Sequence, residues 1–405
     1  IGKNVIETLT LGMYEDPRII YREYIQNAAD QIDIAVEESR PPVLATKADG
    51  QILILINAAQ RSITIEDNAT GIKSEEALQF LADVARSTKD PNQRKGFRGI
   101  GRLGGLGYCE KLIFETSYKN EPIRSVVSLD AKELRRIISS KKITLDASAV
   151  ISAITSLDSP PEKRSAHYFR VKLEGVTDDD LLNEEIIRTY LSMVAPVPFA
   201  KEFKFKDKIH TYFDKNNVVI DEYNVCNVVL NSEKIYKAYK NDIVDKYNKP
   251  IATVLDVKFF KIRNWERQLI AIGWYGITDF LNKKIPLNNI ERGFRIRKSN
   301  ITIGNEHTLN KFFREQRFNH HYIGEIHAIG SLFIPNARRD FFNDNRTVDS
   351  FTSELTLQFK RLTKLSHICS ELRSRLRDLK YFRNVEERFD EKQRMQFLNE
   401  GEEEY

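Results

Sequence analysis

The sequence has little cysteine and no long apolar run. Its 405 residues include three cysteines, which are far apart and odd in number (Cys109, Cys226 and Cys369). A disulfide scaffold and a cysteine-rich zinc site are therefore excluded, and such cysteine usage suits a reducing cytoplasm. No segment reaches the roughly 18 uncharged apolar residues that a membrane helix requires. We therefore expect a cytoplasmic protein that has no membrane partner.

An excess of charge of one sign is also lacking. The 63 Lys and Arg residues exceed the 58 Asp and Glu residues by only five, a balance that does not by itself indicate a nucleic-acid-binding protein. Apolar residues make up 41% of the chain, which is enough for sizeable cores, and roughly 100–200 residues per domain allow two to four domains. The chain begins at Ile1 and ends in Glu-Glu-Glu-Tyr, so we expect a fragment of a longer protein.

Glycine is unevenly distributed along the chain. Six of the 18 glycines lie between Gly96 and Gly107, within a segment over residues 89–107 that is rich in Lys and Arg and has no periodicity. We predict a long binding loop there, whose backbone N–H groups are suited to hold phosphates. The segment is not a P-loop, because no Gly-Lys-Ser/Thr follows, and no strand leads into it as a dinucleotide fingerprint requires. The alternative is a flexible surface loop.

A polar stripe lies on a predicted helix near the start of the chain. Apolar residues recur at helical spacing through the first forty positions, and Glu23, Asn27 and Asp30 are spaced i, i+4 and i+7. These three residues therefore share one face of the helix. Most polar stripes of this kind are simply solvated, so the stripe alone does not establish a site.

A carboxylate ends one of the strands that follow. Asp67 comes directly after the second predicted strand, and Gly71 follows in the next turn. A carboxylate at a strand end can accept a hydrogen bond from an exocyclic amine, and a glycine lets the backbone approach a flat ring closely. The alternative is an ordinary Asp-Asn turn. Alternating and apolar runs predict the strands at residues 51–57, 62–66, 111–117, 124–129 and 167–174.

Taken in this order, the three elements resemble the GHKL ATPase superfamily, which includes DNA gyrase, HtpG-type chaperones, histidine kinases and MutL, with MORC proteins as relatives. The resemblance covers about residues 1–175. It implies an α+β fold of the Bergerat type, an α/β sandwich with helices on one face of a mixed, mainly antiparallel sheet. It also implies that the ligands are ATP and Mg²⁺.

The resemblance also implies a role for each matching residue. Glu23 would be the general base that polarises the attacking water, and Asn27 would hold Mg²⁺ through its side-chain oxygen. Asp30 would support the nucleotide site, Asp67 would bind the adenine amino group, and Gly71 would let the adenine lie close. The remaining nucleotide-binding positions would flank or form a lid over the phosphates: Ser87, Thr88, Lys89, Gly99, Gly101, Gly104, Gly105 and Gly107.

Two positions depart from the pattern of the superfamily. Ala69 stands where the first glycine of Asp-x-Gly-x-Gly is usual, so the turn after Asp67 is expected to differ. The superfamily often has a Gly-Thr pair at the start of a late strand that contacts the adenine. The matching stretch here is 166–169, Ala-His-Tyr-Phe, which puts that contact in doubt.

The second part of the chain, about residues 200–345, resembles the middle domain of HtpG-type chaperones, and this implies a ribosomal-protein-like β-α-β fold. Leu332–Asn343 resembles the catalytic loop of that domain, in which an arginine reaches the terminal phosphate. Arg339 matches the arginine by position, whereas Arg338 occupies a serine position, so either is a candidate and we favour Arg339. The alternative is a basic surface turn.

A heptad pattern over residues 348–379 predicts one long helix. It is either a dimerising coiled coil or a helix packed on its own middle domain, and residues 360–383 contain eight Lys and Arg. The predicted domains are thus an ATP-binding domain (1–199), a middle domain (200–345) and a basic helix (346–405). No histidine has the neighbours of a transition-metal site.

Two classes of function follow. The first is an HtpG-like ATPase, a conformational machine that acts on protein clients and works as a homodimer. The second is a MORC- or MutL-like ATP-gated clamp on DNA, in genome or phage defence. A third, simpler interpretation is a nucleotide-binding regulatory module without turnover.

Overall fold

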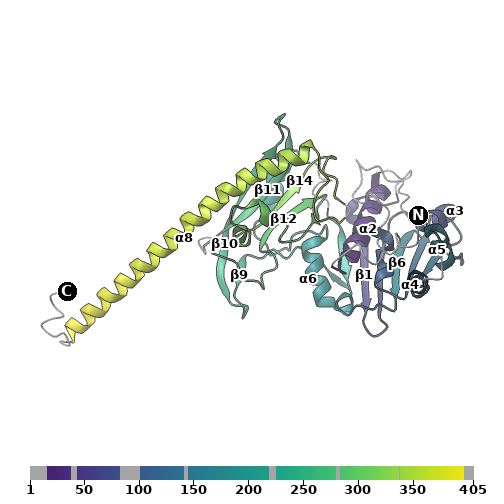
Figure 1. Cartoon of the computed structure of the whole chain (residues 1–405), viewed down its shortest axis with the longest axis horizontal. Helices are drawn as coiled ribbons and strands as arrows, with labels where there is room; N and C mark the ends of the chain where they lie inside the picture. The colour runs from purple at the N-terminus through teal and green to yellow at the C-terminus, as the bar shows by residue number, and fades with distance from the viewer. Residues whose placement is uncertain are drawn as a thin grey trace.

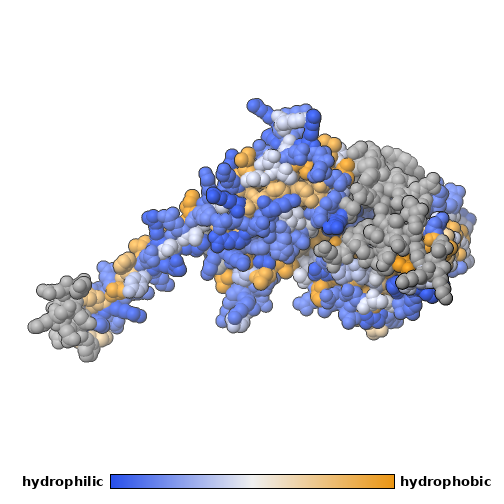
Figure 2. Space-filling model, viewed as in Figure 1, coloured by the Kyte–Doolittle hydropathy of each residue, from blue (hydrophilic) through white to orange (hydrophobic). Residues whose placement is uncertain are grey.

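The computed structural model describes residues 16–37, 43–82, 101–140, 145–218, 225–279, 283–336 and 338–395. Two β-sheets lie side by side, and a long helix, α8 (Arg346–Arg394), extends from the second sheet as an arm (Figure 1). Hydrophilic and hydrophobic patches alternate along this arm (Figure 2). The architecture confirms the predicted mixed α+β fold with helices on sheets. None of the helices in the described ranges is long and apolar enough to cross a membrane.

The first sheet has eight strands in the order β5-β4-β3-β6-β2-β1-β7-β8. Neighbouring strands of this sheet pair antiparallel, except that β1 and β7 are parallel to each other. The sheet is therefore mixed, as predicted. The five strands predicted before residue 175 are all present. The bounds are β1 Gln51–Asn57, β2 Ser62–Asp67, β3 Lys111–Ser117, β4 Ser125–Asp130, β5 Thr155–Asp158, β6 Tyr168–Glu174, β7 Asn227–Leu230 and β8 Glu233–Lys234.

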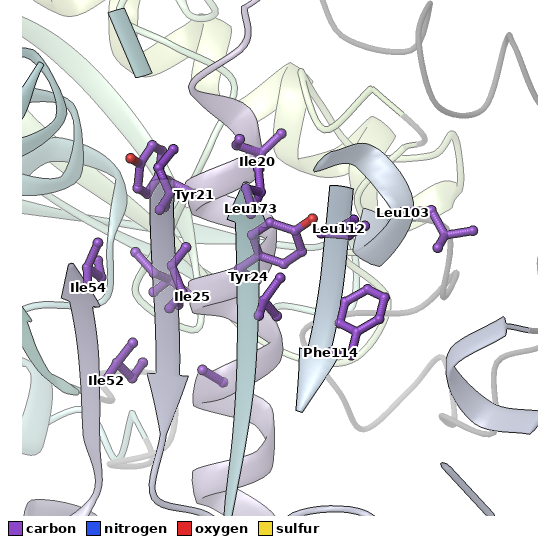
Figure 3. Packing of buried hydrophobic residues seen from close by; sticks show 14 of the residues in the cluster. Ile20, Tyr21, Tyr24, Ile25, Ile52, Ile54, Leu103, Leu112, Phe114 and Leu173 are labelled. Carbon is purple, nitrogen blue, oxygen red and sulfur yellow. The ribbon is translucent and has the colours of Figure 1, made fainter. Parts of the chain in front are cut away.

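Helices cover one face of this sheet. The alternating burial along β2 shows that one face is covered and the other is more open to solvent. Helix α2 packs its apolar residues Ile20, Tyr24 and Ile25 on the covered face, over Ile54 of β1 and Leu112 of β3 (Figure 3). The helices of this part are α2 Ile19–Glu37, α3 Ser74–Ala82, α4 Ala131–Ser139, α5 Ala147–Ile154, α6 Glu184–Val194 and the short 3₁₀ turns η1 Lys47–Asp49, η2 Gly101–Gly107 and η3 Asp180–Leu182.

The chain returns to the first sheet after the expected boundary near residue 200. Helix α6 ends at Val194, directly before a stretch that contains two prolines, as the sequence predicts. Helix α7 (Lys206–Asp214) follows, and then β7 and β8 join the edge of the first sheet, with Asn227 opposite Gln51. Two strands that lie beyond residue 200 therefore belong to the first sheet, which the predicted boundary at 199/200 did not anticipate.

The second sheet has six strands in the order β13-β12-β14-β11-β10-β9. Strands β12 and β14 run parallel, and 3₁₀ turns, η5 (Asn310–Phe312) and η6 (Gln316–His321), lie in the connection between them. Two α-helices of the described residues pack on this sheet: α7, whose Ile209 and Phe213 share a core with Trp274 of β11, comes before the first strand of the sheet, and α8 comes after the last. The strands are β9 Asp242–Val244, β10 Pro250–Arg263, β11 Leu269–Thr278, β12 Gly293–Lys298, β13 Ile301–Ile303 and β14 Ile323–Ala328.

Helix α8 has a packed part and an exposed part. The Asn345 side chain caps its start by accepting from the backbone N–H groups of Thr347 and Val348. The apolar residues of the packed part, such as Phe351 and Phe359, are buried in the core of the second sheet. The second half of the helix is largely exposed, and the interpretation that the helix packs on its own domain therefore holds only for the first half. The exposed apolar residues are Ile368, Leu372, Leu376, Leu379, Tyr381, Phe382 and Val385.

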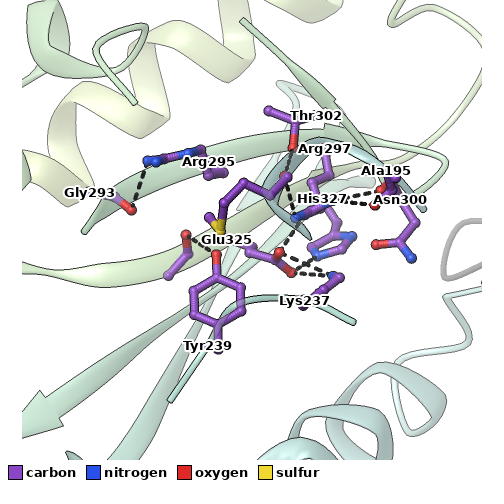
Figure 4. Close-up of polar contacts among 12 residues, drawn as sticks. Ala195, Lys237, Tyr239, Gly293, Arg295, Arg297, Asn300, Thr302, Glu325 and His327 are labelled. Atoms are coloured by element: carbon purple, nitrogen blue, oxygen red, sulfur yellow. Dashed lines mark hydrogen bonds and ion pairs between the residues drawn. The ribbon is translucent and has the colours of Figure 1, made fainter. Parts of the chain in front are cut away.

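A cluster of buried charges joins α6 to the second sheet (Figure 4). The Arg297 side chain of β12 is fully buried and pairs with the Glu325 carboxylate of β14. Its Nη2 donates to the Met193 carbonyl at 2.8 Å, and the Thr302 hydroxyl donates to the same carbonyl at 2.7 Å. Met193 lies in the last turn of α6, where carbonyls have no partner within the helix. The second sheet thus supplies the missing donors of α6.

The Glu325 carboxylate is shared among three cationic or titratable groups. It accepts from Lys237 Nζ at 2.8 Å and contacts His327 Nε2 at 3.0 Å, in addition to Arg297. Burial opposes ionisation of Glu325, but Arg297 and Lys237 outweigh it and hold its pKa well below the usual range. Burial, together with Arg297, lowers the pKa of Lys237 to about 7. The Glu325 carboxylate therefore remains charged and binds the strands of this cluster together.

Candidate functional site

The polar stripe of α2 is buried rather than solvated. Glu23 and Asp30 are each 3% exposed, and Asn27 is half-buried. Burying two carboxylates is costly unless other groups stabilise them. The interpretation of the stripe as an ordinary solvent-exposed face is therefore wrong, and the stripe is part of a built site.

The Glu23 carboxylate meets an arginine from the second domain. Arg339 Nε lies 2.5 Å from Glu23 Oε1, and Arg22 Nε lies 4.0 Å from the same oxygen. Among the described residues, Glu23 Oε1 nevertheless accepts no hydrogen bond, so the contact with Arg339 is an ion pair in which the N–H does not point at the oxygen. Gly101 lies beside the other oxygen, because a Cβ at Gly101 would be 2.3 Å from Glu23 Oε2.

The segment that carries Arg339 is a tight hairpin. The Asn336 backbone N–H donates to the Phe341 carbonyl and the Asn343 N–H donates to the Ile334 carbonyl, so the two arms of the hairpin are paired. Arg339 has a positive φ of 54°, which is unusual for a residue with a side chain. Its carbonyl accepts from the Gly304 N–H at 2.8 Å, so this backbone conformation is fixed against the end of β13.

Of the two candidate arginines, Arg339 is the one that reaches Glu23. Its Nη1 also donates to Gln26 Oε1 on α2 at 2.7 Å, and these residues are 313 positions apart in the sequence. Arg338 is exposed, by contrast. The alternative in which this loop is only a basic surface turn does not account for these contacts. The Asp340 carboxylate accepts from the Asn336 side chain within the hairpin.

Asp67 lies on the face of the first sheet that the helices cover. It is 2% exposed and continues the row of Ile63 and Ile65 along β2, at a position where the period of the strand calls for an apolar residue. Its Oδ1 accepts from the Ala69 N–H at 3.1 Å, which begins the turn. Thr116 of β3 is at the same level of the sheet as Asp67, because both residues lie opposite Phe169 of the intervening strand β6.

The two departures from the superfamily pattern contact each other. The Ala69 carbonyl lies 2.8 Å from His167 Nδ1, so the residue in place of the first glycine is bound to the residue in place of the Gly-Thr pair. Thr116 provides a further polar group in this region. Its Oγ1 accepts from the Ile72 N–H at 2.8 Å and donates to the Tyr168 carbonyl at 3.1 Å. The turn after Asp67 is thus fixed by β3 and β6.

Gly71 is required by the protein itself. It has a positive φ of 69°, and a Cβ there would be 2.0 Å from the Ser117 carbonyl oxygen. The collision is with backbone, which cannot rotate away as a side chain can. The predicted reason for this glycine was the approach of an adenine ring, whereas the contact in the structure is with the neighbouring strand.

The glycine-rich segment is described only from Gly101 onward. Ser87, Thr88, Lys89 and Gly99 lie outside the described residues, and their predicted contacts stay predictions. Residues 101–107 form the 3₁₀ turn η2, not an irregular loop. Gly104 and Gly105 are buried in it, and the Gly105 N–H donates to the Tyr24 hydroxyl at 3.1 Å. This N–H therefore serves packing against α2, which differs from its predicted contact with phosphate.

The described residues fit a nucleotide with a metal-bound phosphate tail. Asp67 offers a buried acceptor, and Glu23 offers an oxygen that accepts no hydrogen bond from the described residues. Asn27 lies one turn from Glu23, and a side-chain amide oxygen is a ligand that Mg²⁺ accepts in a hydrated, octahedral site. This arrangement can orient a water for attack on a phosphate whose charge a guanidinium neutralises.

Sequence reasoning missed Gln26, Thr116 and Arg22. Gln26 adjoins Asn27 in the helix, but nothing in its spacing indicates that it will meet an arginine 313 positions away. Thr116 carried a detectable signal, because it places a hydroxyl in the apolar row of β3. Arg22 lies on the helix beside Glu23 and is 4% exposed, and its burial becomes evident only with the second domain in place.

Comparison with known proteins agrees with this geometry. Residues 23–159 match the family described as histidine kinase-, DNA gyrase B- and HSP90-like ATPases. The chaperone protein HtpG of Buchnera aphidicola subsp. Acyrthosiphon pisum is 33% identical over 28% of this chain and 20% of its own length. The HtpG of Cupriavidus necator is 32% identical over 27% of this chain and 19% of its own length. The similarity therefore spans about a fifth of these relatives.

The substitution Gly71→Ala is expected to lower the free energy of unfolding more than the substitution Gly330→Ala does. Both glycines have positive φ, 69° and 92°, but a Cβ at Gly330 meets nothing within 4 Å. Gly330→Ala thus isolates the backbone strain, roughly 1–2 kcal/mol, and Gly71→Ala adds the collision with Ser117. Chemical denaturation of both variants measures the difference. Equal losses of unfolding free energy would contradict the close approach of β3.

Proposed function

We propose that this chain, in which residues 23–159 form a GHKL-type ATPase domain, hydrolyses ATP and couples hydrolysis to movement between its two domains. The single observation that supports the proposal is the contact of Arg339 with Glu23. A general base and a cation for the terminal phosphate come from different domains and meet in one place. A nucleotide-binding module without turnover has no need of this pair.

We assign the role of each residue from its position in the site. Asp67 accepts from the adenine amino group, and Glu23 takes a proton from the attacking water after Arg339 has left its carboxylate. Asn27 would hold Mg²⁺, which neutralises phosphate charge when it is bound. Arg339 leaves Glu23 and turns to the developing charge on the transferred phosphoryl group. The exchange releases the carboxylate at the point where it must act as a base.

An HtpG-like conformational machine is the cellular role that this arrangement favours. HtpG relatives are chaperones by name, and in the proposed cycle ATP closes the glycine lid while the second domain docks through Arg339. Docking then changes the direction of the α8 arm, because the first half of α8 is packed on the second sheet. The exposed apolar residues of the arm are the surface that we propose for protein clients or for a second copy of the chain.

Replacement of Glu23 tests the proposed base. Glu23→Ala should lower the rate of ATP hydrolysis by about 10²–10⁴-fold, the usual contribution of a positioned general base. ATP binding, measured by calorimetry, should change little, because Asp67 and the amide of Asn27 remain. Asp67→Asn is the matched control, which should lose binding instead. Full hydrolysis by Glu23→Ala would show that the base is assigned wrongly.

The two arginines of the hairpin provide a second test. Arg339→Met should lower the hydrolysis rate about a hundredfold or more, as expected for loss of a group that stabilises developing charge. Arg338→Met keeps the same loop and removes an exposed guanidinium, so its rate should stay near that of the unmodified chain. If Arg338→Met hydrolysed ATP slowly and Arg339→Met hydrolysed it at the normal rate, the roles of the two arginines would be reversed. If both were silent, docking of the second domain would not contribute to hydrolysis.

A clamp on DNA is the second candidate, and the surface of α8 favours it. Basic side chains are exposed along the arm, and a basic helix can follow a phosphate backbone. The measurement is DNA binding with and without ATP at two salt concentrations, together with light scattering, since a clamp requires two copies. No binding at low salt, or a monomer throughout, would rule it out. The exposed basic residues are Lys360, Arg361, Lys364, Arg375, Arg377, Lys380 and Arg383.

A further inference from the structure

An arginine-rich pocket lies between the two domains. Its volume is about 570 Å³, and its walls come from the start of α2, the end of α6, the region around β12 and β13, and the Arg339 hairpin. Asp16, Glu306 and Asp340 are the carboxylates of the wall, so six guanidinium groups face three carboxylates, an excess of three positive charges. The six arginines are Arg18, Arg22, Arg292, Arg295, Arg338 and Arg339.

Two of these arginines are fully engaged within the protein. Arg18 binds Asp16 through two hydrogen bonds, of 2.9 and 3.0 Å. Arg295 donates to the carbonyls of Arg292 at 2.9 Å and Ile290 at 2.8 Å. Their guanidinium groups therefore shape the wall of the pocket, and they have little capacity left for a ligand.

Arg22 and Arg292 are buried, and Arg22 is not fully hydrogen-bonded among the described residues. Arg22 is 4% exposed, and its Nε and Nη2 have no hydrogen-bond partner among the described residues. Its distance of 4.0 Å to Glu23 is too long for a hydrogen bond. Arg292 is 7% exposed, and its charge, with that of Arg295, acts on the neighbouring Glu306 carboxyl, where burial raises the pKa but these charges help to hold it below its usual value. Burying a guanidinium whose N–H groups lack acceptors is unfavourable, so Arg22, lining one cavity with the buried Arg292, indicates a missing anion.

The charge of Arg292 also acts on His320, although burial has the larger effect there and Glu306 opposes it. Burial lowers the pKa of the neighbouring His320 to about 4, and the charges of Arg292 and His307 contribute to the same shift. A field that disfavours a further positive charge favours a negative one. The geometry and the field therefore agree on the sign of the ligand.

We propose that this pocket binds a phosphate-type anion, either free phosphate or the pyrophosphate unit of a longer ligand, between Arg22 and Arg292. Multiple N–H donors in a planar fork suit phosphate oxygens. This site goes beyond the proposed ATP hydrolysis. Arg22 precedes Glu23 on α2, and successive helical residues point about 100° apart, so the pocket adjoins the face of Glu23 and does not coincide with it.

The two sites share Arg339. This residue lines the pocket and also contacts Glu23 and Gln26. An anion in the pocket competes with Glu23 for the guanidinium. Occupancy of the pocket is therefore linked to whether the Glu23 carboxylate stays paired with Arg339. A phosphate released by hydrolysis and a phosphate supplied from solution would both act through Arg339.

The test is calorimetric titration of the chain with inorganic phosphate and with pyrophosphate, without nucleotide. We expect saturable binding that weakens at least tenfold in Arg292→Gln and in Arg22→Gln, each checked for an unchanged melting transition. Arg136→Gln, a substitution of an exposed arginine paired with Glu133 on α4, is the matched control and should bind as the unmodified chain does. Two substitutions are used so that one that fails to fold does not decide the result.

The variant Asp67→Asn distinguishes binding of the whole nucleotide from binding of a phosphate-type anion alone. It should lose ATP binding and keep pyrophosphate binding, because Asp67 is not part of the pocket. Unchanged pyrophosphate binding in both Arg22→Gln and Arg292→Gln would assign the anion to another site, such as the phosphate end of the nucleotide site, and overturn the proposal, as would no saturable binding at all. None of these readouts requires hydrolysis, so failure of the ATPase proposal would be seen separately.

Discussion

The position of the second domain depends on one buried guanidinium. Arg297 is fully buried, and leaving such a cation unpaired would cost several kcal/mol. The Glu325 carboxylate and the Met193 carbonyl satisfy it, and that carbonyl is at the end of α6, where the helix dipole places partial negative charge. Because Ile187 and Leu191 anchor α6 in the first core, moving the sheets apart at this point would leave a buried charge unpaired.

A short path leads from this contact to the candidate catalytic carboxylate. Thr302 of β13 donates to the same Met193 carbonyl, and two residues later the Gly304 N–H donates to the Arg339 carbonyl. Arg339 in turn contacts Glu23. Each step is a hydrogen bond or an ion pair between fixed elements, so a shift of α6 against β13 is transmitted to the guanidinium beside Glu23. This is a physical basis on which binding in one domain can be sensed by the other.

The parts of the site that were predictable from the sequence are those with a local pattern. Glu23, Asn27 and Asp30 share a helix face by spacing alone, and Asp67 interrupts an apolar row at a strand end. The order of these motifs was enough to predict the fold of the first domain. The rest depends on contacts between distant segments. Nothing local indicates that β7 and β8 return to the first sheet, or that the Gly105 N–H is used by Tyr24. Arg22 and Arg292 have ordinary sequence surroundings, and only the folded chain places both of them in the wall of one pocket.

Arg339 can exchange partners at moderate cost, and this is why a single residue can serve two sites. Its link to Gln26 is a hydrogen bond from a charged donor, of a kind worth about 1.5–3 kcal/mol. Its contact with Glu23 is close but poorly aligned, since Glu23 Oε1 accepts no hydrogen bond. A phosphate with two negative charges offers several aligned acceptors and offsets the loss of both contacts. The positive φ of Arg339 and its carbonyl bond to Gly304 hold the backbone in place meanwhile, so the exchange requires movement of the side chain alone.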